Sequence, residues 1–181
     1  MKKTKPDLRI PSDGKMVDLL RTLAELCETL GLFIADSGLR LTEALELIRS
    51  LESAKFVLRG KAIAYPISIL RGSKNAFYAY MPSWLAIKLE TLDFGENKEV
   101  CKNFIEAGLP VKYLRKWQYN ALVRAGVDLL IAEFIQGRTF KIVGGTNYLG
   151  AFERAMEAYT KALPLLETLL DLIAIENRFI S

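Results

Sequence analysis

Apolar residues recur at helical spacing over most of this 181-residue chain, but the period changes to two between Lys55 and Pro82. That central stretch is rich in Val, Ile, Phe and Tyr, which favour strands. Three strands are predicted in it, at Lys55–Leu58, Ile63–Ile69 and Ala76–Tyr80. The pattern predicts an α+β domain that is mainly α-helical, with a small three-stranded antiparallel sheet.

The sheet region carries two further signals. The composition of Arg71-Gly72-Ser73-Lys74 is that of a turn, which joins the second and third strands as a hairpin. Pro66 has no backbone N–H to give to a neighbouring strand, so it marks an edge strand or a bulge.

Helical patterns precede and follow the sheet. Before it, helices are predicted at residues 16–30, 32–36 and 42–50. Gly31 ends the first, Ser37 and Gly38 break the second, and Thr42 caps the third. Arg40 lies in the break between the second and third helices, where an ordinary surface arginine is one interpretation. After the sheet, helices are predicted at residues 83–92 and 98–107, then from Pro110 onward, and again beyond Tyr148.

The stretch from Val111 to Tyr148 concentrates the chemistry of the chain. Lys112 and Arg115 stand three apart in a predicted helix, so their side chains share one face. Gly126 closes that helix.

A second short helix follows in the same stretch. Asp128 caps it, it runs to about Gln136, and Gly137 ends it. Arg138 sits just past that end, and a Gly-containing loop leads to Tyr148. Cations on a helix and on a turn, followed by a tyrosine, are suited to gripping a phosphate and attacking it.

These residues resemble the C-terminal catalytic motif of the tyrosine recombinases, the phage-type integrases. That motif is His-x-x-Arg, a Gly-His turn, and a nucleophilic tyrosine about ten residues later. The matching positions here are Lys112, Arg115, Gly137-Arg138 and Tyr148. Both usual histidines are absent, and the chain contains none. Lys and Arg at those two positions resemble the archaeal fuselloviral-type integrases, a divergent branch.

An upstream match supports the resemblance, which covers roughly residues 16–159. The stretch IADSGLRLTEALEL, residues 34–47, resembles the first box of the family, and Arg40 corresponds to its arginine. The family places its catalytic lysine at the hairpin, which points to Lys74, with Arg71 and Lys61 as rivals.

The resemblance implies a mechanism. Arg40, Arg115 and Arg138 would clamp the phosphate, whose equatorial oxygens gain charge in the transition state. Tyr148 would attack to give a 3′-phosphotyrosyl link. Two lysines complete the implied mechanism. Lys74 would protonate the leaving 5′ oxygen, and Lys112 would contact the phosphate or assist proton transfer at Tyr148.

Other tyrosines compete for the nucleophile's role. Tyr119 is mid-helix, where a tyrosine is stiff and more often packs, and Tyr113 and Tyr159 are discounted. Trp117 shares an apolar helix side with Leu114, which favours a core position over a platform for stacking bases.

Composition bounds the alternatives. A net charge of +4 and a pI near 9.0 are compatible with a polyanionic partner. Absence of histidine argues against zinc, and Cys27 and Cys101 read as buried free thiols. The sequence has no carboxylate cluster and no Gly-rich phosphate loop, so no metal and no cofactor are expected. No signal peptide or membrane span is evident, so the cytoplasm of the host cell, at the nucleoid, is the expected compartment.

The two ends of the chain carry separate expectations. Residues 1–15 read as a basic tail or linker, and residues 16–181 as the catalytic domain. Full-length integrases carry DNA-binding domains before the catalytic one, so the chain is expected to be a natural or an expressed fragment. Pro164 breaks or kinks the last helical run. The apolar segment 165–181 is expected to dock on a neighbouring protomer, as in related recombinases, or in cis.

Three functions remain open from the sequence. The first is an archaeal viral or plasmid integrase that recombines double-stranded DNA attachment sites as a homo-oligomer, a tetrameric synapse. The second is a type IB-like topoisomerase with the same nucleophile chemistry. The third is a non-catalytic DNA-binding protein.

Overall fold

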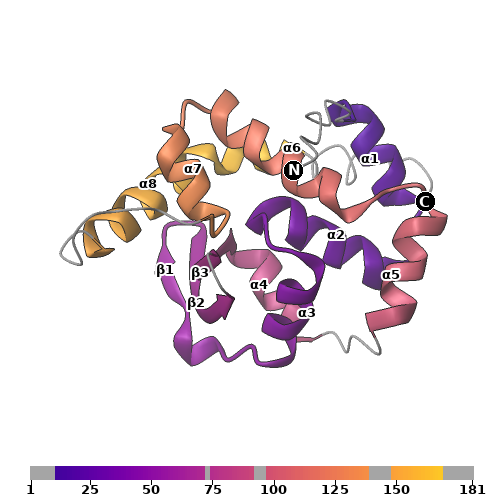
Figure 1. The fold of residues 1–181 in the computed structure, drawn as a ribbon, viewed down its shortest axis with the longest axis horizontal. Coiled ribbons are helices and arrows are strands. Elements are labelled where there is room, and N and C mark those ends of the chain that lie inside the picture. Colours follow the sequence, from indigo (N-terminus) through magenta and orange to yellow (C-terminus); the bar gives the residue numbers. More distant parts are fainter. Residues whose placement is uncertain (1–10, 72–73, 92–96, 139–147, 169–181) are drawn as a thin grey trace, which may run out of the picture.

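The computed structural model describes residues 11–71, 74–91, 97–138 and 148–168. In these ranges the chain forms eight α-helices, one short 3-10 helix and one three-stranded sheet (Figure 1). The predicted class, mainly helical with a small antiparallel sheet, is confirmed. Among the described helices, none combines the length and apolar character needed to cross a bilayer.

Helix α2 (Glu25–Ser37) is the centre of the core, because its residues from Thr29 to Ser37 are all buried. It contacts α1 (Asp13–Arg21), α3 (Leu41–Arg49), α4 (Ser83–Glu90), α5 (Asn97–Glu106) and α6 (Val111–Arg124). Figure 1 shows α2 enclosed by these elements. The C-terminal part of α2 is therefore covered by protein on every side.

The predicted break at Gly31 is wrong, because α2 continues through this residue. A Cβ at Gly31 would lie 2.5 Å from Leu20 Cδ2 and 3.4 Å from a ring atom of Phe104. The glycine is therefore a point of close helix packing rather than a helix end. The break falls instead after Arg21, and Ala24 precedes α2 as a cap residue without a capping side chain.

The sheet has the order β1 (Val57–Arg59), β2 (Ala62–Arg71), β3 (Lys74–Pro82), and both pairs are antiparallel. Lys55, predicted as strand, lies in the 3-10 helix η1 (Ser53–Lys55).

Pro66 lies on β2 beyond the residues that pair with β1, so the strand is locally an edge there, and the bulge interpretation is also confirmed. The register with β3 shifts between Pro66 and Ile69. Strand β1 pairs only as far as Ala64, so no β1 partner is present opposite the proline nitrogen.

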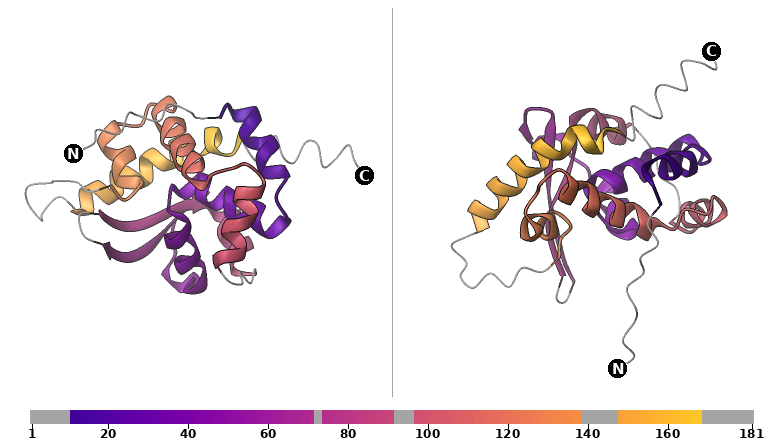
Figure 2. Two further views of the ribbon diagram at one scale, coloured as in Figure 1. Left: turned by 45° about the vertical axis from the view of Figure 1, so that its right-hand side comes forward. Right: turned by 90° about the horizontal axis from the view of Figure 1, so that it is seen from above.

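The last two helices are α7 (Leu129–Ile135) and α8 (Tyr148–Leu166). The Asp128 carboxylate caps α7, accepting from Leu130 N at 2.9 Å, as predicted. Helix α8 crosses β2 and β3 and also packs on α6 and α7 (Figure 2).

Pro164 does not end α8, which continues to Leu166. The predicted break at Pro164 is therefore wrong, while the alternative of a kink stays a prediction. The predicted boundary at residue 165 falls inside a helix. Leu163 and Leu166 on either side of the proline are buried.

Candidate active site

Arg115 lies on α6 and joins the ends of two other helices. Its Nε donates to the carbonyl oxygen of Gly38, and its Nη2 donates to that of Gln136 at 3.5 Å. Gly38 and Gln136 are the C-caps of α2 and α7. The last carbonyls of a helix lack intrahelical donors and carry its partial negative charge. Arg115 therefore satisfies two helix C-termini with one guanidinium.

Arg40 follows Gly38 by two residues and is the N-cap of α3. Its backbone N–H donates to Oε2 of Glu43 at 2.9 Å, and its Nη1 donates to Oε1 of the same carboxylate. The side chain of Glu43 is 6% exposed and that of Arg40 is 36% exposed. Thr42, predicted to cap this helix, lies inside it. Glu43 thus holds Arg40 from the protein side while the arginine still reaches solvent.

Arg138 follows Gln136 by two residues, past Gly137, whose φ of 64° is in the left-handed region. Its N–H donates to the carbonyl oxygen of Glu133 at 2.9 Å. Its guanidinium carbon lies 5.0 Å from the centroid of the Tyr119 ring, a cation–π contact. Tyr119, considered as a rival nucleophile, therefore lies beside Arg138.

The three arginines interact electrostatically. The pKa of Arg115 is lowered to about 10, first by burial and next by the charge of Arg40. Glu43 opposes this effect, and Arg138 adds to it. Arg115 nevertheless remains charged at neutral pH. We call Arg40, Arg115 and Arg138 the arginine cluster; their planar donors suit a bound phosphate.

Lys112 lies on α6, one turn before Arg115, and its side chain is exposed. Its Nζ lies 5.2 Å from the centroid of the Tyr113 ring, and the Nζ of Lys116 lies 5.6 Å from it. The ring of Tyr113 therefore makes cation–π contacts with two ammonium groups. Cations at this end of α6 add to the positive charge of the face.

Lys74 and Tyr148 are described by their backbones only. Lys74 is the first residue of β3 and pairs with Arg71, while Tyr148 is the first residue of α8. Their side chains, and residues 72–73 and 139–147, lie outside the described part of the chain. Their catalytic roles therefore stay predictions.

Two aromatic contacts bring the elements that carry these residues together. Phe77 of β3 stacks on Phe134 of α7 with ring centroids 6.4 Å apart. Tyr78, the next residue of β3, contacts Phe152 of α8, and their ring centroids are 4.4 Å apart. The hairpin end of β3 therefore packs against the C-terminal half of α7 and the first turns of α8.

Lys61, a rival for the catalytic lysine, lies near the opposite end of β2. Its carbonyl oxygen accepts from Ser83 N at 2.8 Å, so it sits where β2 meets α4. Arg71, the other rival, pairs with Lys74 at the hairpin end, and its side chain lies outside the described part.

Tyr159 is fully buried in the core, and burial followed by the charge of Asp36 raises its pKa well above the usual range. This agrees with its exclusion as a nucleophile. Trp117 is likewise buried, as predicted, and its Nε1 donates to Oδ1 of Asp13 at 2.6 Å. Cys27 is a buried free thiol, also as predicted, and the side chain of Cys101 lies outside the described part.

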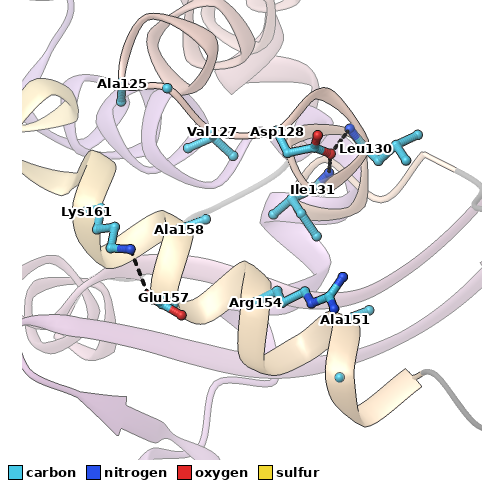
Figure 3. A pocket seen from close by; sticks show the side chains of 12 residues that line it. Ala125, Val127, Asp128, Leu130, Ile131, Ala151, Arg154, Glu157, Ala158 and Lys161 are labelled. Carbon is cyan, nitrogen blue, oxygen red and sulfur yellow. Dashed lines mark hydrogen bonds and ion pairs between the residues drawn. The ribbon is translucent and has the colours of Figure 1, made fainter.

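A groove of about 730 Å³ lies between the α6–α7 turn, the start of α7 and α8 (Figure 3). Arg154, Glu157 and Lys161 line its α8 side. The arginine cluster does not line it. The groove is thus a separate feature from the candidate active site.

Three residues of this site were not predicted: Glu43, Gln118 and Gln136. Glu43 carried a usable signal, because a glutamate three residues after a helix N-cap commonly accepts from the cap backbone. Gln118 lies three residues after Arg115 and so shares its helix face. Gln136 carried no signal, since its burial depends on tertiary packing.

The chain matches a known protein family over most of its length. A family model described as archaeal phage integrase matches residues 10–165. None of the curated proteins matches the chain. The matched region extends from the residues before α1 to the last turn of α8, and it contains every residue of the arginine cluster. The chain therefore belongs to the archaeal phage integrase family.

Proposed function

We propose that this protein is the catalytic part of a site-specific tyrosine recombinase, which integrates or excises the DNA of an archaeal virus or plasmid. The carrying observation is the convergence of Arg40, Arg115 and Arg138 from three separate segments on one partly buried point. Holding three like charges together is costly in free energy, because burial and mutual repulsion both disfavour them. An anionic ligand offsets that cost, and a DNA phosphate is the anion that an integrase handles.

In the proposed reaction, the arginine cluster binds the non-bridging oxygens of the scissile phosphate. The phenolic oxygen of Tyr148 forms a bond to phosphorus, and the bond from phosphorus to the 5′ oxygen breaks. Lys74 gives a proton to that 5′ oxygen, and Lys112 assists removal of the proton from Tyr148. A 5′-hydroxyl from another strand then attacks the phosphotyrosine, so the bond energy is conserved without ATP.

Two features of the backbone support this assignment. Tyr148 follows Arg138 by ten positions and begins α8, whose first turns contact β3. Lys74 begins β3 at its hairpin end, which packs on α7 just before Arg138. Both residues therefore belong to elements that pack beside the arginine cluster.

The proposed partner is a double-stranded DNA attachment site, bound by a homo-oligomer that forms a tetrameric synapse in the host cytoplasm. The net charge of +4 assists nonspecific attraction to the phosphate backbone. Sequence preference is expected from groups that reach base edges in the grooves.

The test is covalent capture on DNA. The protein is incubated with a pool of nicked duplexes of randomised sequence, in which the short strand downstream of the cleavage point diffuses away and traps the adduct. We expect a covalent protein–DNA band on a denaturing gel, and an enriched sequence among the captured strands. Complete absence of an adduct over the pool would contradict recombinase chemistry.

A second step separates recombination from topoisomerase activity. Two intact duplexes that carry the enriched sequence are mixed with the protein, and recombinant products are measured. Reciprocal exchange is expected only between duplexes with the site. Relaxation of any supercoiled plasmid, without exchange, would assign the same chemistry to a topoisomerase instead.

A further inference from the structure

The chain has two glutamines, Gln118 and Gln136, and their side chains are hydrogen-bonded to each other. Gln118 lies on α6 and is 0% exposed; Gln136 ends α7 and is 2% exposed. Nε2 of Gln136 donates to Oε1 of Gln118 at 2.7 Å. Buried amide groups need partners for both of their ends, so the further contacts of the pair define its role.

The remaining bonds of the pair reach the backbone of two helices. Nε2 of Gln118 donates to the carbonyl oxygen of Asp36 at 3.2 Å, near the end of α2. Nε2 of Gln136 also donates to the carbonyl oxygen of Arg115 at 2.6 Å. Together with the bonds from Arg115 to Gly38 and Gln136, these contacts tie the ends of α2 and α7 to α6.

Each tied segment carries one member of the arginine cluster. Arg115 itself donates the hydrogen bonds to Gly38 and Gln136. Arg40 comes two residues after Gly38, and Arg138 comes two residues after Gln136. The chain between a tied residue and its arginine is too short to allow much independent movement. The hydrogen bonds of the two glutamines therefore set the relative positions of the three guanidinium-bearing segments.

The amide orientations leave no equivalent alternative. Turning the amide of Gln136 would place its oxygen against the Arg115 carbonyl and the Oε1 of Gln118, which are both acceptors. Turning Gln118 would oppose its oxygen to the Asp36 carbonyl. One arrangement satisfies all three bonds, so the pair specifies a single geometry.

Gly38 is fitted to this pair. Its φ of 68° is in the left-handed region, and a Cβ there would lie 2.8 Å from Oε1 of Gln118. The absence of a side chain lets the Gly38 carbonyl reach Arg115 while the Gln118 amide lies beside the turn.

One atom of the pair is left without a partner. Oε1 of Gln136 is buried and accepts no hydrogen bond among the described residues. An unsatisfied buried acceptor lowers stability, so the pair keeps its geometry at a cost in free energy. We propose that Gln118 and Gln136 are positioning residues, which hold Arg115 at the place where it meets Arg40 and Arg138 around the scissile phosphate. This inference rests on the proposed recombinase function.

The test compares Gln136→Met and Gln118→Met with the unchanged protein. Methionine keeps the length and approximate volume of glutamine but removes the amide. The matched control is Thr29→Val, which removes a different buried hydrogen bond of α2, from Thr29 Oγ1 to the Glu25 carbonyl. DNA affinity and the single-turnover rate of adduct formation at saturating DNA are measured on the captured site.

We expect the cleavage rate of both glutamine variants to fall about 10- to 100-fold, because small displacements of a catalytic group cost rates of this order. DNA affinity should change by less than about threefold, since other phosphate contacts remain. The Thr29→Val protein should cleave at the original rate. Unchanged cleavage by folded glutamine variants would overturn the inference.

A second readout needs neither a variant that folds nor an active enzyme. In the unchanged protein, NMR follows solvent exchange of the Nε–H of Arg115 against that of exposed Arg154. We expect slow exchange at Arg115, and faster exchange in Gln136→Met where that variant folds. Rapid exchange at Arg115 in the unchanged protein would overturn the positioning role. Absence of any adduct from the unchanged protein would instead overturn the proposed function.

Discussion

Arg115 combines two demands that usually conflict. It is buried enough that its pKa falls to about 10, and it remains a cation at neutral pH. The carbonyl groups at the ends of α2 and α7 stabilise the charge, and the Glu43 carboxylate adds to this. A half-buried cation with these partners is preorganised, so the proposed binding of a phosphate would require little rearrangement.

At Lys74, we predict that Lys74→Ala slows cleavage about 10²- to 10⁴-fold on a normal phosphodiester, the usual range for loss of a general acid. A substrate with a 5′-thio leaving group should be cleaved by the variant at nearly the original rate, because a thiolate leaves without protonation. Both rates are measured in single-turnover adduct assays. Equal defects on the two substrates would exclude Lys74 as the acid and direct attention to Lys112, Arg71 or Lys61.

At Asp36, we predict an unusual pH dependence of stability. Burial raises the pKa of this carboxyl well above 3.8, and the charge of Glu167 raises it further. The folded state therefore binds a proton more tightly than the unfolded state. Its contribution to stability is full below pH 3.8 and is lost as the pH rises through the folded pKa.

The measurement is urea unfolding of the protein and of Asp36→Asn over a pH series. The stability of the variant relative to the original should increase as the pH rises from about 4 towards neutrality, because asparagine has no carboxyl to ionise. Asp18→Asn, at an exposed position of α1, is the control for the change of net charge. A stability difference that does not depend on pH would show that Asp36 does not titrate in this way.

At the scale of elements, local signals predicted what local forces decide. The Asp128 cap, the glycine ends at Gly38, Gly126 and Gly137, and the change of period at the sheet are all present in the structure. The helix end expected at Gly31 and the break expected at Pro164 are absent, because tertiary packing decides both positions. The close crossing with Leu20 requires a glycine at position 31, and the buried Leu163 and Leu166 hold Pro164 inside α8.

Some residues of the candidate site could be predicted from the sequence and others could not. Spacing and resemblance indicated Arg40, Arg115 and Arg138, and the structure brings them together. The glutamine pair was not predicted, because the two residues are 18 positions apart and Gln118 lies 82 positions after its partner Asp36. Hydrogen bonds between such distant segments leave no local pattern in a single sequence.

The packing at Gly31 gives a direct prediction. Gly31→Leu should lower the free energy of unfolding by about 1–3 kcal/mol or more, because its Cβ alone meets Leu20 at 2.5 Å in a filled core. Gly14→Leu, in α1 where a Cβ meets nothing within 4 Å, should be neutral or stabilising by up to about 1 kcal/mol. Urea unfolding of both variants checks this. Equal effects at the two positions would contradict the close packing described for α2.

At the scale of the whole molecule, α2 joins structure to function. It is the most enclosed helix of the described part, and its C-terminal end supplies two of the carbonyls that fix the arginine cluster. The same helix contacts β3, α5 and α6. The fold thus assembles the site around one buried helix end, which belongs to the region matched by the integrase family.

Assembly on DNA is the next prediction at this scale. The family resemblance favours docking of the C-terminal segment on a neighbouring protomer, which would couple cleavage to synapsis. The test is a deletion of residues 169–181, because a deletion from Leu165 would also remove the buried Leu166. The shortened protein should remain folded, assemble less on DNA and give less adduct. Unchanged assembly and cleavage would exclude this role for the segment.

The most direct measurement identifies the amino acid that becomes attached to DNA. The captured adduct is digested with nuclease and trypsin, and the peptide that carries a 3′-nucleotide phosphate is sequenced by mass spectrometry. Tyr148 is the single tyrosine between Lys141 and Arg154, and Tyr119 is the single tyrosine between Lys116 and Arg124, so the two candidates fall on different peptides. We predict modification at Tyr148, and no adduct at all from Tyr148→Phe, whose DNA binding should be nearly unchanged. Modification of the Tyr119 peptide, or an adduct formed by Tyr148→Phe, would contradict the proposed active site.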